Sequence, residues 1–149
     1  MKTIYCLIIL FAFFSSCNNH KGNDQLPGSI VNNPASADGE APTGDYPIIT
    51  FDTTQFDFRS IKEGEVVTHT FNFKNTGTSN LVVTDVRASC GCTTPFWPKE
   101  IIKPGESNAI TVKYNSEGRE GNFNKGVTVY CNAYPNTATL RIQGVVYPK

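Results

Sequence analysis

The stretch VTHTFNFKNTG, residues 67–77, places Phe71 and Phe73 two positions apart and ends in Asn-Thr-Gly. Successive side chains of an extended strand point to opposite faces, so this alternation is typical of a half-buried β-strand. The Asn-Thr-Gly run is typical of a turn. The stretch therefore predicts a strand that directs both phenylalanines into a core and then reverses.

The same alternation continues on both sides of this strand, over residues 81–92, 110–114, 127–131 and 140–142. Turn signals separate these runs, and no segment has the i, i+3, i+4, i+7 pattern of an amphipathic helix. Short strands at this spacing over about 100 residues are typical of immunoglobulin-like domains. We therefore predict an all-β fold, a single Ig-like antiparallel β-sandwich of about seven strands. Its predicted core includes Phe71, Phe73, Val82, Val86, Val112, Val129 and Ile142. Gly144 is expected to form a bulge near the end of the last strand.

The N-terminus has the features of a secretory signal. Lys2 precedes an apolar run over residues 4–14, which is shorter than the ~20 residues needed to span a bilayer. Ser15, Ser16 and Cys17 follow, as in a bacterial lipobox, in which the cysteine is acylated. We predict a lipoprotein signal peptide at residues 1–16 and a lipid on Cys17. Ordinary secretory cleavage is the alternative.

Residues 17–45 are rich in Asn, Gly, Pro, Ser and Ala and contain no aromatic residue. Such a segment buries too little apolar surface to fold, so we predict a flexible tether before a domain at residues 46–149. No acidic run follows Cys17, which favours a periplasm-facing position in the cell envelope. The chain has 13 basic and 13 acidic residues, so loss of Lys2 with the signal leaves 12 against 13. This balance does not predict a nucleic-acid partner; the expected partners are a membrane and an unknown envelope protein.

The segment ASCGCTTP, residues 88–95, contains Cys90 and Cys92. The pair could bind Cu(I) or Zn(II), act as a redox dithiol, or serve a structural role. Two thiolates do not complete a metal site, and no M-x-C or further C-x-x-C motif adds donors. No basic residue in the segment would lower a thiol pKa. We favour a strand end that carries a dithiol or a labile local disulfide, with no metal and no other cofactor.

Cys131 is not an expected partner for this pair. In an Ig-like order the strand of residues 81–90 lies antiparallel to that of residues 124–132, which places Cys131 near Leu81 or Val82. Cys90 then lies roughly 25 Å away, whereas a disulfide needs Cα atoms within about 7 Å. We expect Cys131 to be a small buried side chain.

Phe96 and Trp97 form an aromatic pair between prolines in residues 93–105, TTPFWPKEIIKPG. They could form a partner-binding patch or fold back as a lid over one end of the sandwich, and we favour the lid because large aromatic residues usually bury.

His69 is the one histidine of the predicted domain and has no nucleophile beside it in the sequence. We therefore predict a packing role for His69, no catalytic residue and no enzymatic activity. Asp85 and Arg87 are expected to form a solvated surface pair.

Three motifs together resemble a known family. They are Phe71-x-Phe73-x-Asn75-Thr76-Gly77, Ser89-Cys90-Gly91-Cys92-Thr93 and Pro104-Gly105-Glu106. The resemblance is to a bacterial family of Ig-like domains of unknown function in envelope lipoproteins, and it covers about residues 51–146. That family is similar in fold to Hydin-type and major-sperm-protein sandwiches. The resemblance implies a fold and a location but no activity. We expect a membrane-anchored, non-enzymatic interaction or structural module, or alternatively a thiol-dependent metal-binding or redox protein that acts through Cys90 and Cys92.

Replacement of the predicted lipid site tests the anchor. The Cys17→Ala variant should be released into the soluble fraction or keep its signal peptide, because alanine has no sulfur atom to which a lipid can be attached. Membrane fractionation and intact mass of the purified protein measure both outcomes. A variant that fractionates and migrates like the wild type would show that Cys17 carries no lipid.

Overall fold

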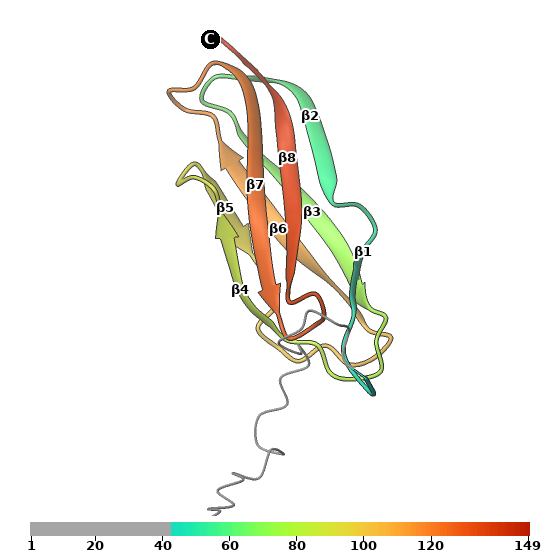
Figure 1. The fold of residues 1–149 in the computed structure, drawn as a ribbon. Helices are drawn as coiled ribbons and strands as arrows, with labels where there is room; N and C mark the ends of the chain where they lie inside the picture. Colours follow the sequence, from blue (N-terminus) through green and yellow to red (C-terminus); the bar gives the residue numbers. More distant parts are fainter. Residues whose placement is uncertain (1–42) are drawn as a thin grey trace, which may run out of the picture. The chain divides into compact units, whose positions relative to one another are not determined.

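The computed structural model describes residues 43–149. The predicted signal peptide, Cys17 and all but the last three residues of the predicted tether lie outside the described residues. The described part contains eight strands and no helix, which confirms the all-β prediction (Figure 1). Consequently, residues 43–149 include no helix that is long and apolar enough to cross a membrane.

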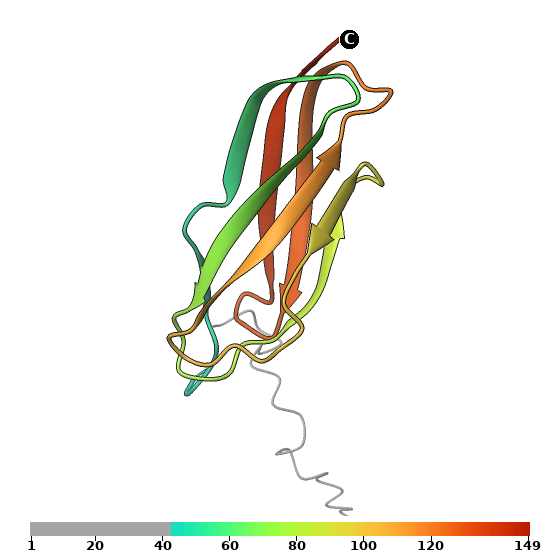
Figure 2. The same ribbon diagram turned by 180° about the vertical axis from the view of Figure 1, so that it is seen from behind.

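The strands form two four-stranded sheets that pack face to face (Figures 1 and 2). The first sheet has the order β1-β3-β6-β5, with β1 at Ile49–Phe51, β3 at Val66–Asn75, β6 at Ser107–Asn115 and β5 at Thr93–Phe96. The second has the order β2-β8-β7-β4, with β2 at Gln55–Lys62, β8 at Thr137–Tyr147, β7 at Gly121–Cys131 and β4 at Val83–Ala88. The predicted Ig-like sandwich is confirmed, with eight strands where about seven were expected.

One strand pair departs from the expected antiparallel pattern. β2 pairs with β8 in parallel, whereas the other ladders between named strands are antiparallel. The reason is that the chain leaves the first sheet after β1 and joins the second sheet at its edge, beside the last strand. Period-two alternation indicates a strand but carries no information about the direction of its neighbour.

The core residues predicted from the alternation are buried, with one exception. Phe71, Phe73, Val86, Val112, Val129 and Ile142 are at most 4% exposed. Val82 is only half-buried, while its neighbours Leu81 and Val83 are buried, so the predicted face was wrong at this position. A β-bulge between Val83 and Asp85 explains the error, because one extra residue reverses the inward face of the strand.

Gly144 also differs from expectation, because it pairs regularly with Phe123 and forms no bulge. A Cβ atom at Gly144 would lie 2.8 and 2.9 Å from two carbons of the Phe123 ring, so the ring occupies the space that a side chain would need. The irregularity lies in the facing strand β2, between Asp57 and Ser60, where Arg59 has a φ of 59°. The expected bulge belongs to the neighbouring strand.

The side chain of Asn75 is fully buried at the end of β3. Its amide nitrogen donates to the carbonyl oxygens of Ser79 and Ile102, at 2.8 and 3.0 Å. Its amide oxygen accepts from the backbone N–H groups of Gly77 and Ile48, at 3.1 and 3.4 Å. One side chain therefore joins the start of β1, the turn after β3 and the connection between β5 and β6.

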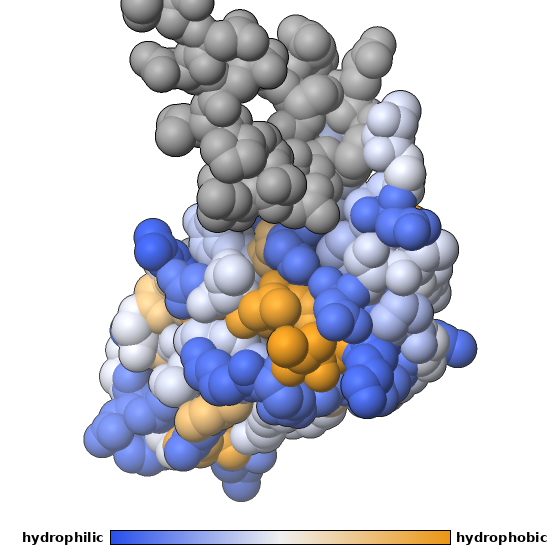
Figure 3. All heavy atoms as spheres, turned by 90° about the horizontal axis from the view of Figure 1, so that it is seen from below, coloured by the Kyte–Doolittle hydropathy of each residue, from blue (hydrophilic) through white to orange (hydrophobic). Residues whose placement is uncertain are grey.

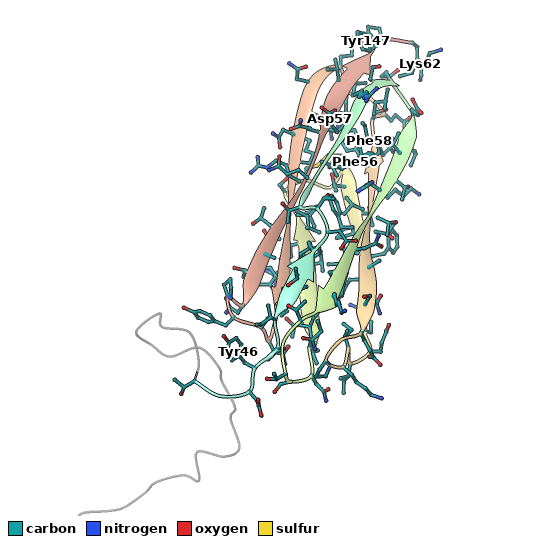
Figure 4. The ribbon with its side chains drawn as sticks, turned by 90° about the vertical axis from the view of Figure 1, so that its right-hand side faces the viewer. Tyr46, Phe56, Asp57, Phe58, Lys62 and Tyr147 are labelled. Carbon is teal, nitrogen blue, oxygen red and sulfur yellow. A yellow bond between two sulfur atoms is a disulfide. The ribbon has the colours of Figure 1, made fainter. Side chains whose placement is uncertain are left out.

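The ring of His69 packs against two aromatic residues of β2, Phe56 and Phe58, which are labelled in Figure 4. Its ring stacks on Phe56 with centroids 3.6 Å apart and meets Phe71 edge-on at 4.6 Å. Phe58 meets Phe56 edge-on at 4.9 Å. Burial among these rings lowers the pKa of His69, because the charged imidazolium loses solvation. This arrangement supports a packing role for His69.

The bulge in β4 predicts that alanine substitutions at two adjacent valines have unequal costs. Val83→Ala should lower the free energy of unfolding by about 2 kcal/mol, because it removes two buried carbon atoms and leaves a cavity. Val82→Ala, its matched control, should cost less than half as much, because Val82 is only half-buried. Urea denaturation of both variants measures the difference. Equal costs, or a larger cost at Val82, would contradict the bulge.

The half-buried imidazole of His69 predicts a pH dependence of stability. The pKa of His69 is lower in the folded state than its ordinary value of 6.5, so the unfolded chain binds the proton more readily. The free energy of unfolding should therefore fall as the pH drops below about 6.5. His69→Phe keeps an aromatic ring against Phe56 and cannot titrate, so this variant should lose less stability between pH 7.5 and pH 5.5. Parallel pH profiles for the two proteins would refute this account.

Candidate functional site

The two candidate regions of the sequence lie at opposite ends of the short strand β5. The turn that contains Cys90 and Cys92 precedes Thr93, the first residue of β5, and connects β4 of the second sheet to β5 of the first. The connection to β6 begins after Phe96, the last residue of β5. Figure 1 shows the turn at one end of β5 and the connection at the other. The structure therefore keeps the cysteine pair and the aromatic pair apart.

The structure joins Cys90 and Cys92 in a disulfide, with a Cα–Cα distance of 5.3 Å. Three backbone hydrogen bonds hold the surrounding turn. The Ser89 N–H donates to Gly126 of β7 at 2.9 Å, and the Asn115 N–H of β6 donates to Cys92 at 2.9 Å. Within the turn, the Thr93 N–H donates to Cys90 at 3.2 Å. Both sheets therefore fix the position of the turn independently of the sulfur–sulfur bond.

The Thr93 hydroxyl is the polar group closest to the disulfide in the hydrogen-bond network. Thr93 is 4% exposed, and its Oγ1 lies 3.5 Å from the Cys90 sulfur and 3.8 Å from the Cys92 sulfur. No charged residue occurs in residues 88–95. Gly91 is exposed, and apart from its chain neighbours Cys90 and Cys92 no other described residue has an atom within 4 Å of the position its Cβ would take. The turn thus has an open outer side and one buried hydroxyl on its inner side.

The disulfide makes a poor structural staple. It links cysteines two positions apart and closes a loop of three residues. In the chain-entropy description such a loop contributes only about 1.6 kcal/mol, against about 3 kcal/mol for a 15-residue loop. Its contribution to stability is therefore near the lower end of the range for native disulfides, which favours a chemical role.

Cys131 takes no part in this site. It is a free thiol, 6% exposed, and it pairs with Val83 at the far end of β4 from Cys90. Burial raises the pKa of its thiol, because the thiolate would lose solvation. Its position and burial agree with the sequence-based expectation, and its thiol is correspondingly inert.

The connection between β5 and β6 divides its aromatic pair between the core and the surface. Trp97 is half-buried and packs against the core, with the Lys99 amino group 3.3 Å from the centre of its ring. Phe96 is 56% exposed and Ile101 is 57% exposed. Trp97 thus covers the end of the sandwich as a lid, while Phe96 points outward. The space-filling view of this end shows an apolar area surrounded by polar residues (Figure 3).

The described residues contain no group of three or more His, Cys, Asp and Glu side chains that could hold a metal ion. A shallow hollow of about 630 Å³ lies across β2, β7 and β8 and is lined by Asp57, Gln143 and Gly144 among others. Asp57 is engaged in the β2 bulge, where it accepts hydrogen bonds from the Arg59 N–H at 2.7 Å and the Gln143 side chain at 3.2 Å. The predicted surface pair is present, with Arg87 Nε 2.7 Å from the Asp85 carboxylate.

Two contacts of the candidate sites were not predicted from the sequence. The hydroxyl of Thr93 faces the sulfurs because the chain bends at Gly91. A glycine between the cysteines indicates such a bend, but it does not indicate which neighbouring side chain the bend brings to the sulfurs. The contact of Lys99 with Trp97 had a signal that was missed, since residues i and i+2 of an extended segment share one face. Thr93 and Lys99 each lie within three positions of a residue that was assigned to a candidate site from the sequence.

Solved structures with a similar fold come from unrelated settings. A protein of unknown function from Porphyromonas gingivalis aligns over 80% of this chain and 51% of its own length, with 14% identity and a TM-score of 0.60. The ASH/PapD-like domain 7 of human CEP192 aligns over 68% of this chain and 86% of its own length, with 11% identity and a TM-score of 0.53. The VesB protease of Vibrio cholerae aligns over 65% and 31%, with 17% identity and a TM-score of 0.53.

These similarities show the fold alone. This chain spans about half the length of the Porphyromonas protein and about a third of VesB. No protein with a curated description matches the sequence significantly. Residues 49–146 match the family DUF1573, described as a protein of unknown function, and the chain therefore belongs to that family.

Proposed function

We propose that this protein is a lipid-anchored, non-enzymatic binding module of the bacterial cell envelope. A lipid on Cys17 holds it at a membrane, facing the periplasm, and the connection between β5 and β6 binds an envelope protein. The observation that carries this proposal is the exposure of Phe96 and Ile101, at 56% and 57%, on either side of the half-buried Trp97. Large apolar side chains that are exposed on an otherwise polar surface are typical of protein-binding sites.

The connection that carries these side chains is held in place. Leu81 and Ile102 exchange two backbone hydrogen bonds of 2.9 Å, and Ile102 is buried directly beside Ile101. The Glu100 carboxylate accepts from the Asn108 side chain at 2.8 Å. The amino group of Lys99 lies over Trp97, where a cation–π contact restrains both side chains. Such a surface loses little conformational entropy on binding, which increases affinity.

The N-terminal sequence supports the anchored position. The apolar run that ends in Ser15-Ser16-Cys17 is typical of lipoprotein signals. Residues 18–45 comprise 28 residues of tether-like composition. A flexible chain of that length has an end-to-end distance of roughly 30 Å. The domain would thus reach a partner beyond the lipid headgroups while it stays attached to the membrane.

Site-specific crosslinking of the full chain in living cells tests the binding surface. A photoreactive phenylalanine analogue at Phe96 should crosslink to a discrete envelope protein. The matched control carries the same analogue at Tyr147, which is 55% exposed near the opposite end of the sandwich and should give no such product (Figure 4). Adding Ile101→Ala should reduce the Phe96 product by about fivefold or more, because it removes the second exposed apolar side chain of the same connection.

The melting temperature of the Ile101→Ala variant should stay close to that of the wild type, since the side chain is exposed. Equal crosslinking from both photoreactive positions, or a Phe96 product that does not depend on Ile101, would overturn the assignment of this surface.

A further inference from the structure

We propose that the Cys90–Cys92 disulfide is a thiol–disulfide exchange site, which accepts two electrons from a thiol or dithiol donor while the sandwich stays folded. The proposal uses a different part of the surface from the β5–β6 connection and stands independently of partner binding. It rests on the anchoring of the turn, on the small loop that the disulfide closes and on the position of the Thr93 hydroxyl.

The turn keeps its cysteines together without the disulfide. The hydrogen bonds of Ser89 to Gly126 and of Asn115 to Cys92 attach its two ends to β7 and β6. These bonds involve backbone groups alone, so reduction of the sulfurs leaves them intact. The two thiols of the reduced protein therefore remain close enough to close again.

The loop is also small enough for reduction to release little constraint. Only Gly91 separates the two cysteines, so the disulfide restricts the unfolded chain far less than a long-range bridge does. Gly91 is exposed and the cysteines are half-buried, so the open outer side of the turn admits a small thiol or a flexible peptide. Accessible disulfides whose formation contributes little free energy are the ones that are readily reduced.

Thr93 favours the reduced state. Its hydroxyl is buried, and its hydrogen-bond partners in the structure are the two sulfur atoms. A disulfide sulfur is a weak acceptor, whereas a thiolate is a strong one, so the same hydroxyl gains a better bond when either sulfur leaves. Stabilisation of the reduced form makes a disulfide a stronger oxidant. Thr93 is thus a positioning residue for the leaving sulfur.

The exchange proceeds in two steps. A thiolate of the donor attacks one sulfur of the pair, a donor–protein disulfide forms, the bond between Cys90 and Cys92 breaks, and the other sulfur leaves as a thiolate beside Thr93. A second donor thiolate then attacks the donor sulfur of this mixed disulfide, the donor becomes a disulfide, and the second cysteine leaves. Two electrons and two protons pass from the donor to the protein, which ends with two thiols.

Equilibration of the full chain with glutathione tests the site. The protein is extracted from membranes in mild detergent, in a Cys131→Ala background that leaves no buried thiol. It is incubated at graded ratios of reduced to oxidised glutathione, alkylated, and analysed by peptide mass spectrometry. We expect Cys90 and Cys92 to become reduced while the circular dichroism spectrum stays that of the folded protein.

Two variants of Thr93 test the role of the hydroxyl. Thr93→Val keeps the shape of the side chain and should lower the equilibrium constant for reduction by about threefold or more, since it removes the bond to the leaving sulfur. Thr93→Ser keeps the hydroxyl and should restore the wild-type value. A structural role for Thr93 would instead change the melting temperature in both redox states equally and leave the equilibrium constant unchanged.

A disulfide that resists glutathione until denaturant unfolds the domain would overturn the proposal, and this measurement needs no substitution at Thr93. Reduction that unfolds the protein would also overturn it. Equal equilibrium constants for the wild type and Thr93→Val would refute the role assigned to Thr93.

Discussion

The buried amide of Asn75 connects three separate parts of the chain at one end of the sandwich. Its four hydrogen bonds reach Ile48 before β1, the turn after β3, and Ile102 in the connection between β5 and β6. A fully buried amide must satisfy its donors and acceptors or lose several kcal/mol. The loops can therefore adopt few other arrangements, and the placement of Ile101 on the surface follows from the burial of Ile102 beside it.

The short strand β5 links the two candidate sites. It spans only Thr93–Phe96 and lies at the edge of the first sheet, with Pro95 in its third position. Proline at an edge strand removes a free backbone donor and so discourages pairing with another chain. The edge of β5 is consequently a poor template for the addition of another strand. The two candidate sites lie instead in the turn before β5 and in the connection after it.

The candidate sites were predictable to different depths. The C-G-C motif and the aromatic pair can be recognised in the sequence, because two cysteines separated by one residue and two adjacent aromatic residues between prolines are both conspicuous patterns. The sequence did not show that Trp97 packs against the core while Phe96 is exposed. Both residues are large and apolar, and only the path of the connection decides which of them faces the core. Thr93 was likewise inconspicuous until the bend at Gly91 placed its hydroxyl beside the sulfurs.

For the fold, the sequence alone determined that the chain forms strands, which side chains most strands bury, and that Cys131 lies too far from Cys90 to pair with it. The first two conclusions depend on local periodicity, which the chain carries residue by residue, and the third depends on the strand order that an Ig-like pattern implies. Only the tertiary structure decided that β2 runs parallel to β8, that a bulge exchanges Val82 for Val83 in the core, and that Gly144 makes room for Phe123. Each of these depends on a neighbouring strand that is distant in sequence, so no local pattern could encode it.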